Sequence, residues 1–137
     1  MTKYTAFPYP LVYVDVSLSA HEFKIILTQP FMYCDERYGF ITAPKDFDSN
    51  LASIPQSVQN LIPKVGTYDA AALIHDWLYA TMMYPKKDCD NIFLRAMKDS
   101  GVSYVKRYTI YWAVRLFAEK AWNDCKKDVE KYRGMIK

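Results

Sequence analysis

The hydrophobic pattern of the chain changes about one third of the way along it. The first 45 residues contain short apolar runs, rich in β-branched residues and separated by polar or proline-containing segments. Runs of this length and composition are typical of β-strands. We predict strands at residues 11–16, 22–28, 31–34 and 38–42. Residues 1–10 contain two prolines and are expected to form an irregular arm. The four strands predicted within residues 11–45 indicate an antiparallel β-meander.

The second half of the chain carries apolar residues at helical spacing. We predict three helices, over residues 69–84, 88–100 and 104–131. Asp69 is suited to cap the first helix, Pro85 to end it and Gly101 to stop the second. In the third helix, the positions expected to face the core are Ile110, Val114, Phe117 and Ala121.

Strands that precede all of the helices indicate an α+β fold rather than an alternating α/β fold. A chain of 137 residues fits a single domain. We therefore expect the N-terminal antiparallel β-meander to pack on the three C-terminal helices, which together span residues 69–131.

A polar loop, residues 44–66, joins the two parts. It contains Asp48, Asn50 and Ser53, which are residue types that often bond the local backbone. Polar loops between apolar elements are also where binding sites tend to lie. We therefore treat these three residues as candidate binding residues.

The composition excludes several classes of protein. The net charge is +3, from 18 Lys and Arg against 15 Asp and Glu, without a long basic run, so we predict no nucleic-acid binding. Three scattered cysteines indicate neither a disulfide framework nor a zinc site. The sequence has no membrane-length apolar run and no signal-peptide pattern, so we predict neither integral membrane association nor export. The 12 tyrosines either rim the core or form a surface for partners.

The most informative segment is AAALIHDWLY, residues 70–79, within the first predicted helix. It is apolar on nearly all sides, which indicates a buried helix. At 100° per residue, His75, Asp76 and Tyr79 fall within about one third of the helix circumference. Because an unpaired buried carboxylate is costly, Asp76 is expected to meet a cation, a hydrogen-bond donor or a metal ion.

Two interpretations of this polar stripe are open. In the first, His75 is a base toward water, Asp76 orients it or binds a metal, and Asp90 approaches from the next, antiparallel helix, with Tyr79 completing the catalytic set. In the second, the stripe is a polar latch without chemistry, and Asp88 or Asp90 caps its own helix. Convergence on the floor of an open cleft would favour the first interpretation, and mutual burial the second.

Three further residues invite a chemical interpretation. Arg107 and Arg115 lie about two turns apart on the third predicted helix and suit a clamp for an anion. Alternatively they pair with acids, and Glu119 is four residues from Arg115. Cys89 is a weaker candidate nucleophile, because no second histidine is near it in the sequence.

Several motifs follow one another between residues 40 and 120. The segment Pro44–Pro55 is similar to a loop of pattern P-x-G-F-x-T-D-x-A-S-x-P. After it come the His75-Asp76 helix, Asp90-Asn91-Ile92-Phe93, Arg107 and Ala113-Val114-Arg115. Together these motifs resemble the phage-associated domain-of-unknown-function family numbered 1353. Members of that family are mostly encoded by bacteriophages and prophages, often near structural or lysis genes, and no activity is established for the family as a whole.

The resemblance also bears on a cofactor. Where the family pattern has Gly and Asp, this chain has Asp46 and Asn50. If the loop Asp is a metal ligand in relatives, Asn50 keeps one oxygen but loses the charge, so a divalent cation at Asp76 would bind more weakly. Asp48, the second candidate metal ligand, could compensate for the lost charge. The HDxxY helix is locally similar to the catalytic helix of secretory phospholipases, whose glycine-rich calcium loop and disulfides are absent here.

Three functions are consistent with these features. The first is a bacteriophage virion-associated or accessory protein with a hydrolase-like site, metal-dependent or degenerate, in which Asn50, Ser53, Arg107 and Arg115 bind the substrate. The second is a non-enzymatic phage structural protein, such as a tail, neck or capsid-attached component. The third is an inhibitor that sequesters a host factor. We expect phage structural proteins or a host protein as partners, and a location in the host cytoplasm during infection or in the virion.

Overall fold

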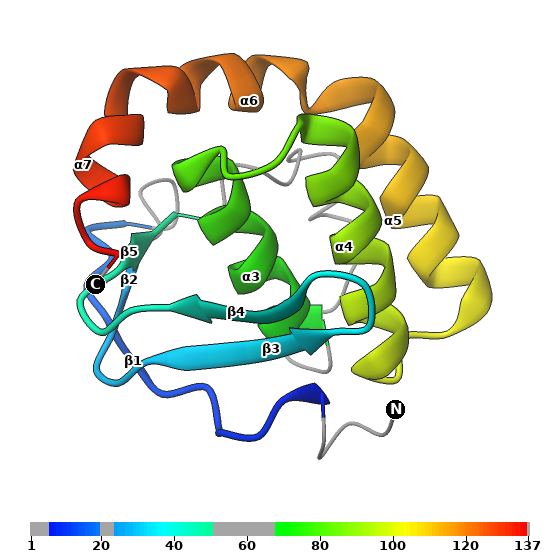
Figure 1. The fold of residues 1–137 in the computed structure, drawn as a ribbon, viewed down its shortest axis with the longest axis horizontal. Coiled ribbons are helices and arrows are strands. Elements are labelled where there is room, and N and C mark those ends of the chain that lie inside the picture. Colours follow the sequence, from blue (N-terminus) through cyan, green and yellow to red (C-terminus); the bar gives the residue numbers. More distant parts are fainter. Residues whose placement is uncertain (1–5, 20–23, 51–67, 137) are drawn as a thin grey trace.

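A computed structural model describes residues 6–19, 24–50 and 68–136 of the chain. Strands come first and helices follow, so the predicted single-domain α+β fold is confirmed (Figure 1). The strands are β1 (Tyr13–Asp15), β2 (Ile25–Leu27), β3 (Phe31–Asp35), β4 (Gly39–Ala43) and β5 (Asp48–Ser49). The helices are α3 (Tyr68–Thr81), α4 (Lys86–Asp99), α5 (Tyr104–Phe117), α6 (Glu119–Cys125), the 3-10 turn η1 (Lys126–Asp128) and α7 (Val129–Arg133).

The strands form two small antiparallel sheets rather than one continuous meander. β3 and β4 form a hairpin, whereas β2 pairs with β1 on one side and β5 on the other. The unpredicted strand β5 follows a turn in which the amide of Asp46 donates to the carbonyl of Leu27 (2.9 Å), and the amide of Leu27 donates to the carbonyl of Phe47 (3.0 Å). This turn carries the start of the predicted polar loop into a sheet beside α3.

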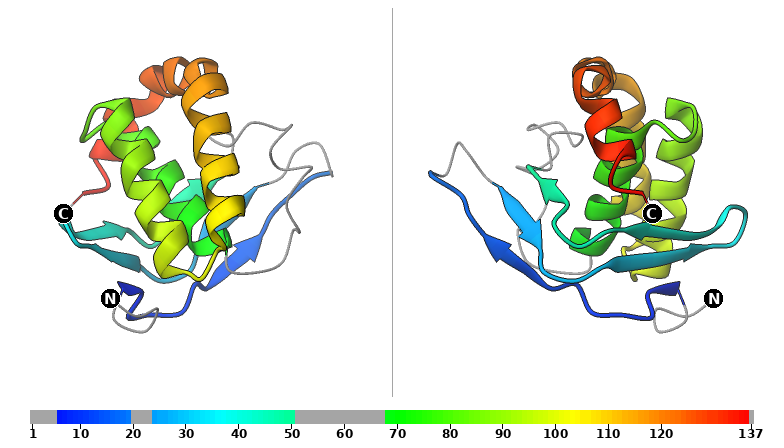
Figure 2. Two further views of the ribbon diagram at one scale, coloured as in Figure 1. Left: turned by 90° about the vertical axis from the view of Figure 1, so that its right-hand side faces the viewer. Right: turned by 60° about the vertical axis from the view of Figure 1, so that its left-hand side comes forward.

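Helix α3 lies at the centre of the fold, with strands, α4, α6 and α7 around it (Figures 1 and 2). Twelve of its 14 residues are buried, so the predicted burial on all sides is confirmed. The helix begins at Tyr68, which places Asp69 in its first turn rather than at the cap. It ends at Thr81, earlier than predicted, because Met82 takes a left-handed φ of 47°. Pro85 instead precedes α4 as its N-cap residue.

The prediction of one continuous helix over residues 104–131 is wrong. The helix breaks at the buried Ala118, where α6 turns across the top of the view in Figure 1 and α7 descends toward the sheets. The bend brings Trp122 against Tyr79, with ring centroids 5.0 Å apart, and Tyr132 against Phe47, 5.5 Å apart. These aromatic contacts bury apolar surface that a straight helix would leave in solvent.

The break also changes which side chains of this segment reach the core. Ile110 and Val114 are buried as predicted, and Ala121 is half-buried. Phe117, the last residue of α5, is exposed instead of buried, because the chain turns away directly after it.

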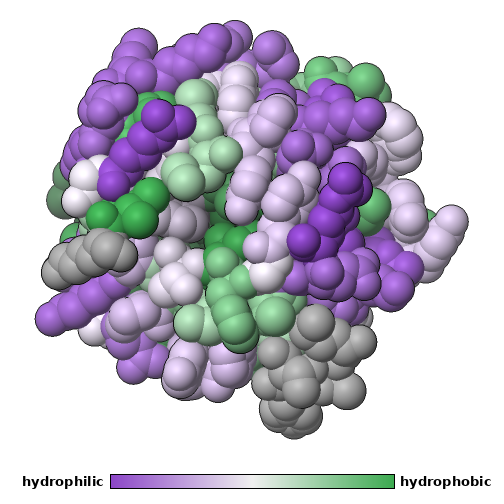
Figure 3. Space-filling view, viewed as in Figure 1, coloured by the Kyte–Doolittle hydropathy of each residue, from purple (hydrophilic) through white to green (hydrophobic). Residues whose placement is uncertain are grey.

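The surface seen in Figure 3 carries hydrophilic residues along the edge formed by α6 and α7 and apolar residues nearer the middle of that face.

A partly buried ion pair joins β3 to α4. The guanidinium of Arg95 donates to Asp35 through Nε (2.8 Å) and Nη2 (3.0 Å). The amides of Arg37 and Tyr38 donate to the same carboxylate, at 3.1 and 2.9 Å. Asp35 therefore holds the β3–β4 turn and the helix behind it together.

The described part of the N-terminal arm, residues 6–10, also packs on the sheet: Phe7 lies 5.7 Å from Phe31 and 4.8 Å from Tyr33, measured between ring centroids. Within the described ranges, no helix is long and apolar enough to cross a bilayer.

Candidate functional site

The polar stripe predicted on α3 divides between two places in the structure. His75 and Tyr79, one turn apart, both bond Asp90 of α4. Asp76 is the next residue along the helix and therefore points about 100° away, where it accepts a hydrogen bond from the hydroxyl of Ser49 in β5. The side chains expected at one site thus lie in two environments, which we describe in turn.

The first environment is a buried network around Asp90, formed by His75, Tyr79, Lys86, Asp90 and Arg115. Oδ1 of Asp90 is 2.7 Å from His75 Nε2 and accepts a 2.7 Å hydrogen bond from the Tyr79 hydroxyl. Oδ2 accepts hydrogen bonds of 3.0 Å from both Lys86 Nζ and Arg115 Nη1. We refer to these five residues as the Asp90 network; it joins α3, α4 and α5.

The predicted approach of Asp90 to His75 is therefore confirmed, and the alternative that Asp88 or Asp90 caps α4 is wrong. The helix starts at Lys86 after Pro85, and no side chain bonds the cap position. Lys86 also donates to the carbonyls of Val114 and Arg115 at the end of α5, each at 3.4 Å. A lysine at this position offsets the partial negative charge of a helix C-terminus.

Asp90 holds its negative charge despite its burial. Burial by itself would raise the pKa of the Asp90 carboxyl, but the hydrogen bond and charge of His75, together with the bonds from Tyr79 and Lys86, outweigh it and hold the pKa at about 2. Burial and the neighbouring Asp90 charge raise the pKa of Tyr79, so its hydroxyl remains a donor. The network is a carboxylate surrounded by donors.

This charge predicts a dependence of stability on pH. The pKa of Asp90 is about 2 in the folded chain and about 4 in an unfolded one. Its contribution, roughly 2 to 3 kcal/mol, is therefore present above pH 4 and is lost as pH falls from about 4 through about 2. Urea unfolding from pH 6 to pH 2 should show this loss in the native sequence and a smaller one in Asp90→Asn. Equal losses in the two proteins would contradict the assignment of this pH dependence to Asp90.

The Asp90 network leaves no space for a substrate at His75. The side chains of His75 and Asp90 are both 0% exposed. The His75 ring stacks on Phe93, with centroids 4.4 Å apart, and lies 4.2 Å from the ring of Tyr79. A general base must reach the proton that it abstracts, directly or through one water. The geometry therefore supports the polar latch more strongly than the catalytic interpretation of His75, Tyr79 and Asp90.

The second environment is a surface cavity of about 490 Å³ beside Asp76. Three residues singled out in the sequence, Asp48, Asn50 and Asp76, line it, together with Asp124 and Asp128 from the C-terminal segment. Ser53, the remaining candidate from the loop, lies outside the described residues. Because the cavity carries more acidic than basic side chains, it is suited to a cationic group rather than to an anion.

The residues of this cavity do not form a ready-made metal centre. The carboxylate of Asp48 is 3.2 Å from Lys24 Nζ and accepts a 3.0 Å hydrogen bond from Tyr132, while Asp76 is bonded by Ser49. In the part of the chain that the structure describes, no three His, Cys, Asp or Glu residues are grouped so that they could hold a metal ion. The predicted pair of metal ligands, Asp76 and Asp48, therefore shares a cavity without the geometry of a cation site.

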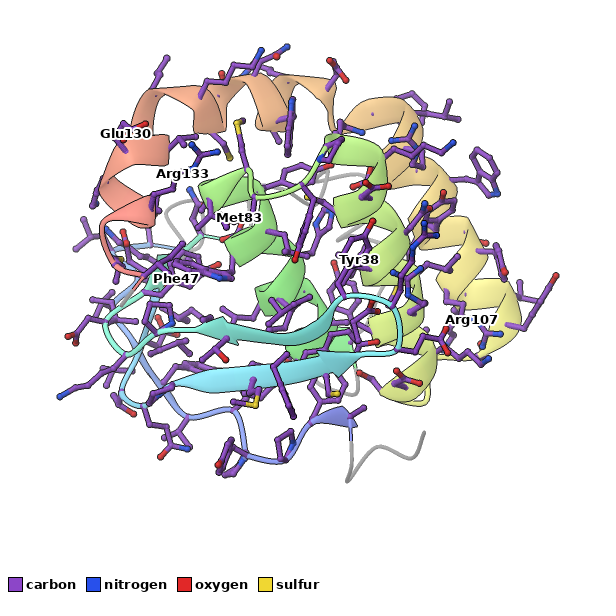
Figure 4. The ribbon with its side chains drawn as sticks, viewed as in Figure 1. Tyr38, Phe47, Met83, Arg107, Glu130 and Arg133 are labelled. Carbon is purple, nitrogen blue, oxygen red and sulfur yellow. The ribbon has the colours of Figure 1, made fainter. Side chains whose placement is uncertain are left out.

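The two candidate arginines do not form a clamp. Arg115 bonds Asp90 rather than the predicted Glu119. Arg107 donates to the carbonyl of Val102 (3.2 Å), and its guanidinium lies 5.2 Å from the centre of the Tyr104 ring. Figure 4 shows Arg107 on the opposite side of the molecule from Phe47, which lines the Asp76 cavity. An anion held between these arginines is therefore not supported by the structure.

The cysteines near these sites are poorly suited to nucleophilic chemistry. Burial raises the pKa of the Cys89 thiol to about 12, with the charge of Asp90 adding to the effect. Burial likewise raises the pKa of Cys125, in the wall of the Asp76 cavity, to about 12. Because the thiolate is the reactive form, both residues are unreactive thiols near neutral pH.

Two important residues were missed in the sequence. Lys86 could have been found, because it lies four residues before Asp90 on one helix, the spacing of a helical ion pair. Ser49 carries no such signal, since its bond to Asp76 joins residues 27 positions apart. It does occupy the place where the family pattern has Thr, and it keeps the hydroxyl that donates to Asp76.

The structure also explains a departure from the family pattern. Asp46, at the place of the usual Gly, has a φ of 74°. Glycine adopts this left-handed conformation without strain, and aspartate tolerates it better than most residues do. The substitution therefore preserves the turn that carries the chain into β5.

One of three comparisons with known proteins supports the resemblance to family 1353. Neither the curated proteins nor the solved structures contain a match to the chain. The model of a family described as a protein of unknown function, DUF1353, matches residues 25–114. Because this match covers well over half of the chain, from β2 to the C-terminal turns of α5, the protein belongs to the DUF1353 family.

Proposed function

We propose that this chain is a non-enzymatic bacteriophage structural protein, carried in the virion as a tail, neck or capsid-attached component. The observation that carries the proposal is the complete burial of His75 and Asp90. In this pair, which most resembles a catalytic site, Asp90 also accepts hydrogen bonds from Tyr79, Lys86 and Arg115. A buried pair bonded in this way suits a rigid structural role, because a substrate arriving from solvent could not reach it.

The Asp90 network has a clear structural use under this proposal. It links three helices at one carboxylate, and each link is a hydrogen bond or ion pair with restricted geometry. Buried polar groups of this kind can fix one arrangement of helices among several that apolar packing alone would allow. A particle component needs such a defined shape because its contacts with neighbours repeat at each copy.

A hydrolase or a sequestering function would have to use the Asp76 cavity instead of the Asp90 network. The Asp76 cavity, with Asn50 and Asp48 in its wall, lies within the volume range of small-molecule sites. Its residues include neither His75 nor a reactive thiol, and its acidic lining suits a cationic molecule. A hydrolase at this place would have to work without the histidine that suggested it, which is why we place the structural function first.

The proposal predicts that the chain is present in mature particles. Virions of the phage or prophage that encodes it should be purified on a density gradient and analysed by mass spectrometry. We expect its peptides at an abundance comparable with that of minor tail or neck proteins, and constant across the particle peak. An early, non-structural protein of the same phage serves as the control for contamination. Absence from particles, or presence only at the level of the control, would overturn the proposal.

A further inference from the structure

Helix α5 carries a stripe of large apolar side chains on its solvent face. Val105, Trp112 and Leu116 are 74%, 55% and 67% exposed, and the exposed Thr109 lies between them. We call these four residues the α5 stripe. The buried residues Ile110, Tyr111 and Val114 lie on the opposite face of the same helix. The stripe is therefore a second apolar face, separate from the one that packs against α4, and α5 forms an outer edge of the molecule (Figures 1 and 2).

The spacing of the α5 stripe is that of a helix-pairing seam. Its members lie at positions i, i+4, i+7 and i+11, the alternation of three and four residues that forms the a and d positions of a heptad. On a helix rising 1.5 Å per residue, the stripe is about 16 Å long, or three turns. Scattered surface apolar residues are ordinary, but a regular seam of this length matches the groove of one partner helix.

The charges of α5 indicate the chemistry of that partner helix. In the heptad set by the stripe, the exposed Lys106 lies on one flank, and α5 contains no Asp or Glu. Arg115, on the other flank, is already paired with Asp90. A second copy of α5 would bring more basic residues and no carboxylate to the seam, which disfavours pairing with itself. We infer that the α5 stripe docks an amphipathic helix of another protein, apolar along one face and acidic on the flanks of that face.

This inference deepens the proposed structural function and rests on it, because a particle component must contact a neighbour. The partner would place leucine-like side chains between those of the α5 stripe and carboxylates near Lys106. Trp112, at the middle of the stripe, is the expected anchor, since tryptophans at the centre of an interface contribute strongly to binding. The surrounding core need not change, because the stripe is already exposed.

Two synthetic helices test the inference with the full-length chain. Both have four heptads with Leu at a and d; one has Glu and the other Lys at e and g. Isothermal titration calorimetry at about 50 mM salt should show binding of the Glu peptide and at least about tenfold weaker binding of the Lys peptide. Trp112→Ala and Leu116→Ala should each weaken binding of the Glu peptide by about thirtyfold. Phe40→Ala, at an exposed residue of β4, should leave it unchanged.

Several outcomes would overturn the inference. The first is that the Glu peptide does not bind, the second is that both peptides bind equally well, and the third is that Trp112→Ala and Phe40→Ala have equal effects. Circular dichroism is used to show that each variant is folded. A dimer by sedimentation that Trp112→Ala converts to a monomer would assign the stripe to a second copy instead. Presence of the chain in virions without binding of the Glu peptide would reject this inference alone. Binding without presence in virions would reject the proposed function alone.

Discussion

Replacing Asp90 with asparagine should lower the free energy of unfolding by about 3 kcal/mol or more. The substitution keeps the shape of the side chain and removes its charge. Lys86 and Arg115 would then face a neutral amide in a largely buried place. Removing one partner of a buried ion pair is costly because the opposite charge is left without compensation.

The control for this prediction is Asp124→Asn. Asp124 also pairs with a lysine four residues away, Lys120, at 3.3 Å, but both side chains are exposed. Exposed pairs of this kind contribute less than about 1 kcal/mol. Urea unfolding at neutral pH, followed by circular dichroism, compares the two variants with the native chain. A loss at Asp90 no larger than the loss at Asp124 would show that the Asp90 network does not stabilise the fold.

The substitution Asp35→Asn should lower the free energy of unfolding by about 2 to 3 kcal/mol. The carboxylate of Asp35 accepts two hydrogen bonds from Arg95 and two from the backbone amides of Arg37 and Tyr38. A neutral amide can accept through one oxygen only, and its nitrogen would repel one of these donor groups. Hydrogen bonds to charged groups contribute more than neutral ones, so the loss should exceed that of an ordinary surface substitution.

Glu36→Gln provides the matched control, because Glu36 is exposed and is the next residue in the same turn. It should change the free energy of unfolding by less than about 0.5 kcal/mol. The measurement is again urea unfolding at neutral pH, with the slope of the transition checked for a change in the unfolded state. If Asp35→Asn and Glu36→Gln proved equally mild, the ion pair with Arg95 would contribute nothing measurable to the attachment of β3 to α4.

Hydrophobic periodicity predicted the central part of this fold well. The apolar run around His75 predicted a buried helix, and α3 is that helix. The next predicted helix, joined by a short connection that contains Pro85, was expected to lie antiparallel to the first, and Asp90 does meet His75. These predictions succeeded because a helix apolar on all sides must be enclosed, and because a short connection forces two helices to lie side by side.

The same reasoning failed where distant segments decide the structure. Between residues 104 and 133 the sequence has neither proline nor glycine, so nothing local marks the break at Ala118. The helix bends because Trp122 and Tyr132 gain contacts with Tyr79 and Phe47. Burial of aromatic surface against other elements overrides the propensity of the segment to remain one helix.

The candidate site also has one part that the sequence predicted and another that only the tertiary structure decided. The sequence by itself determined that polar groups on α3 would be buried and would need partners, since an unsatisfied buried carboxylate is too costly to retain. Only the tertiary structure decided that His75 turns toward Asp90 while Asp76 turns toward Ser49 and a surface cavity. Neighbouring residues on a helix point about 100° apart, so which elements pack on each side assigns them to different environments.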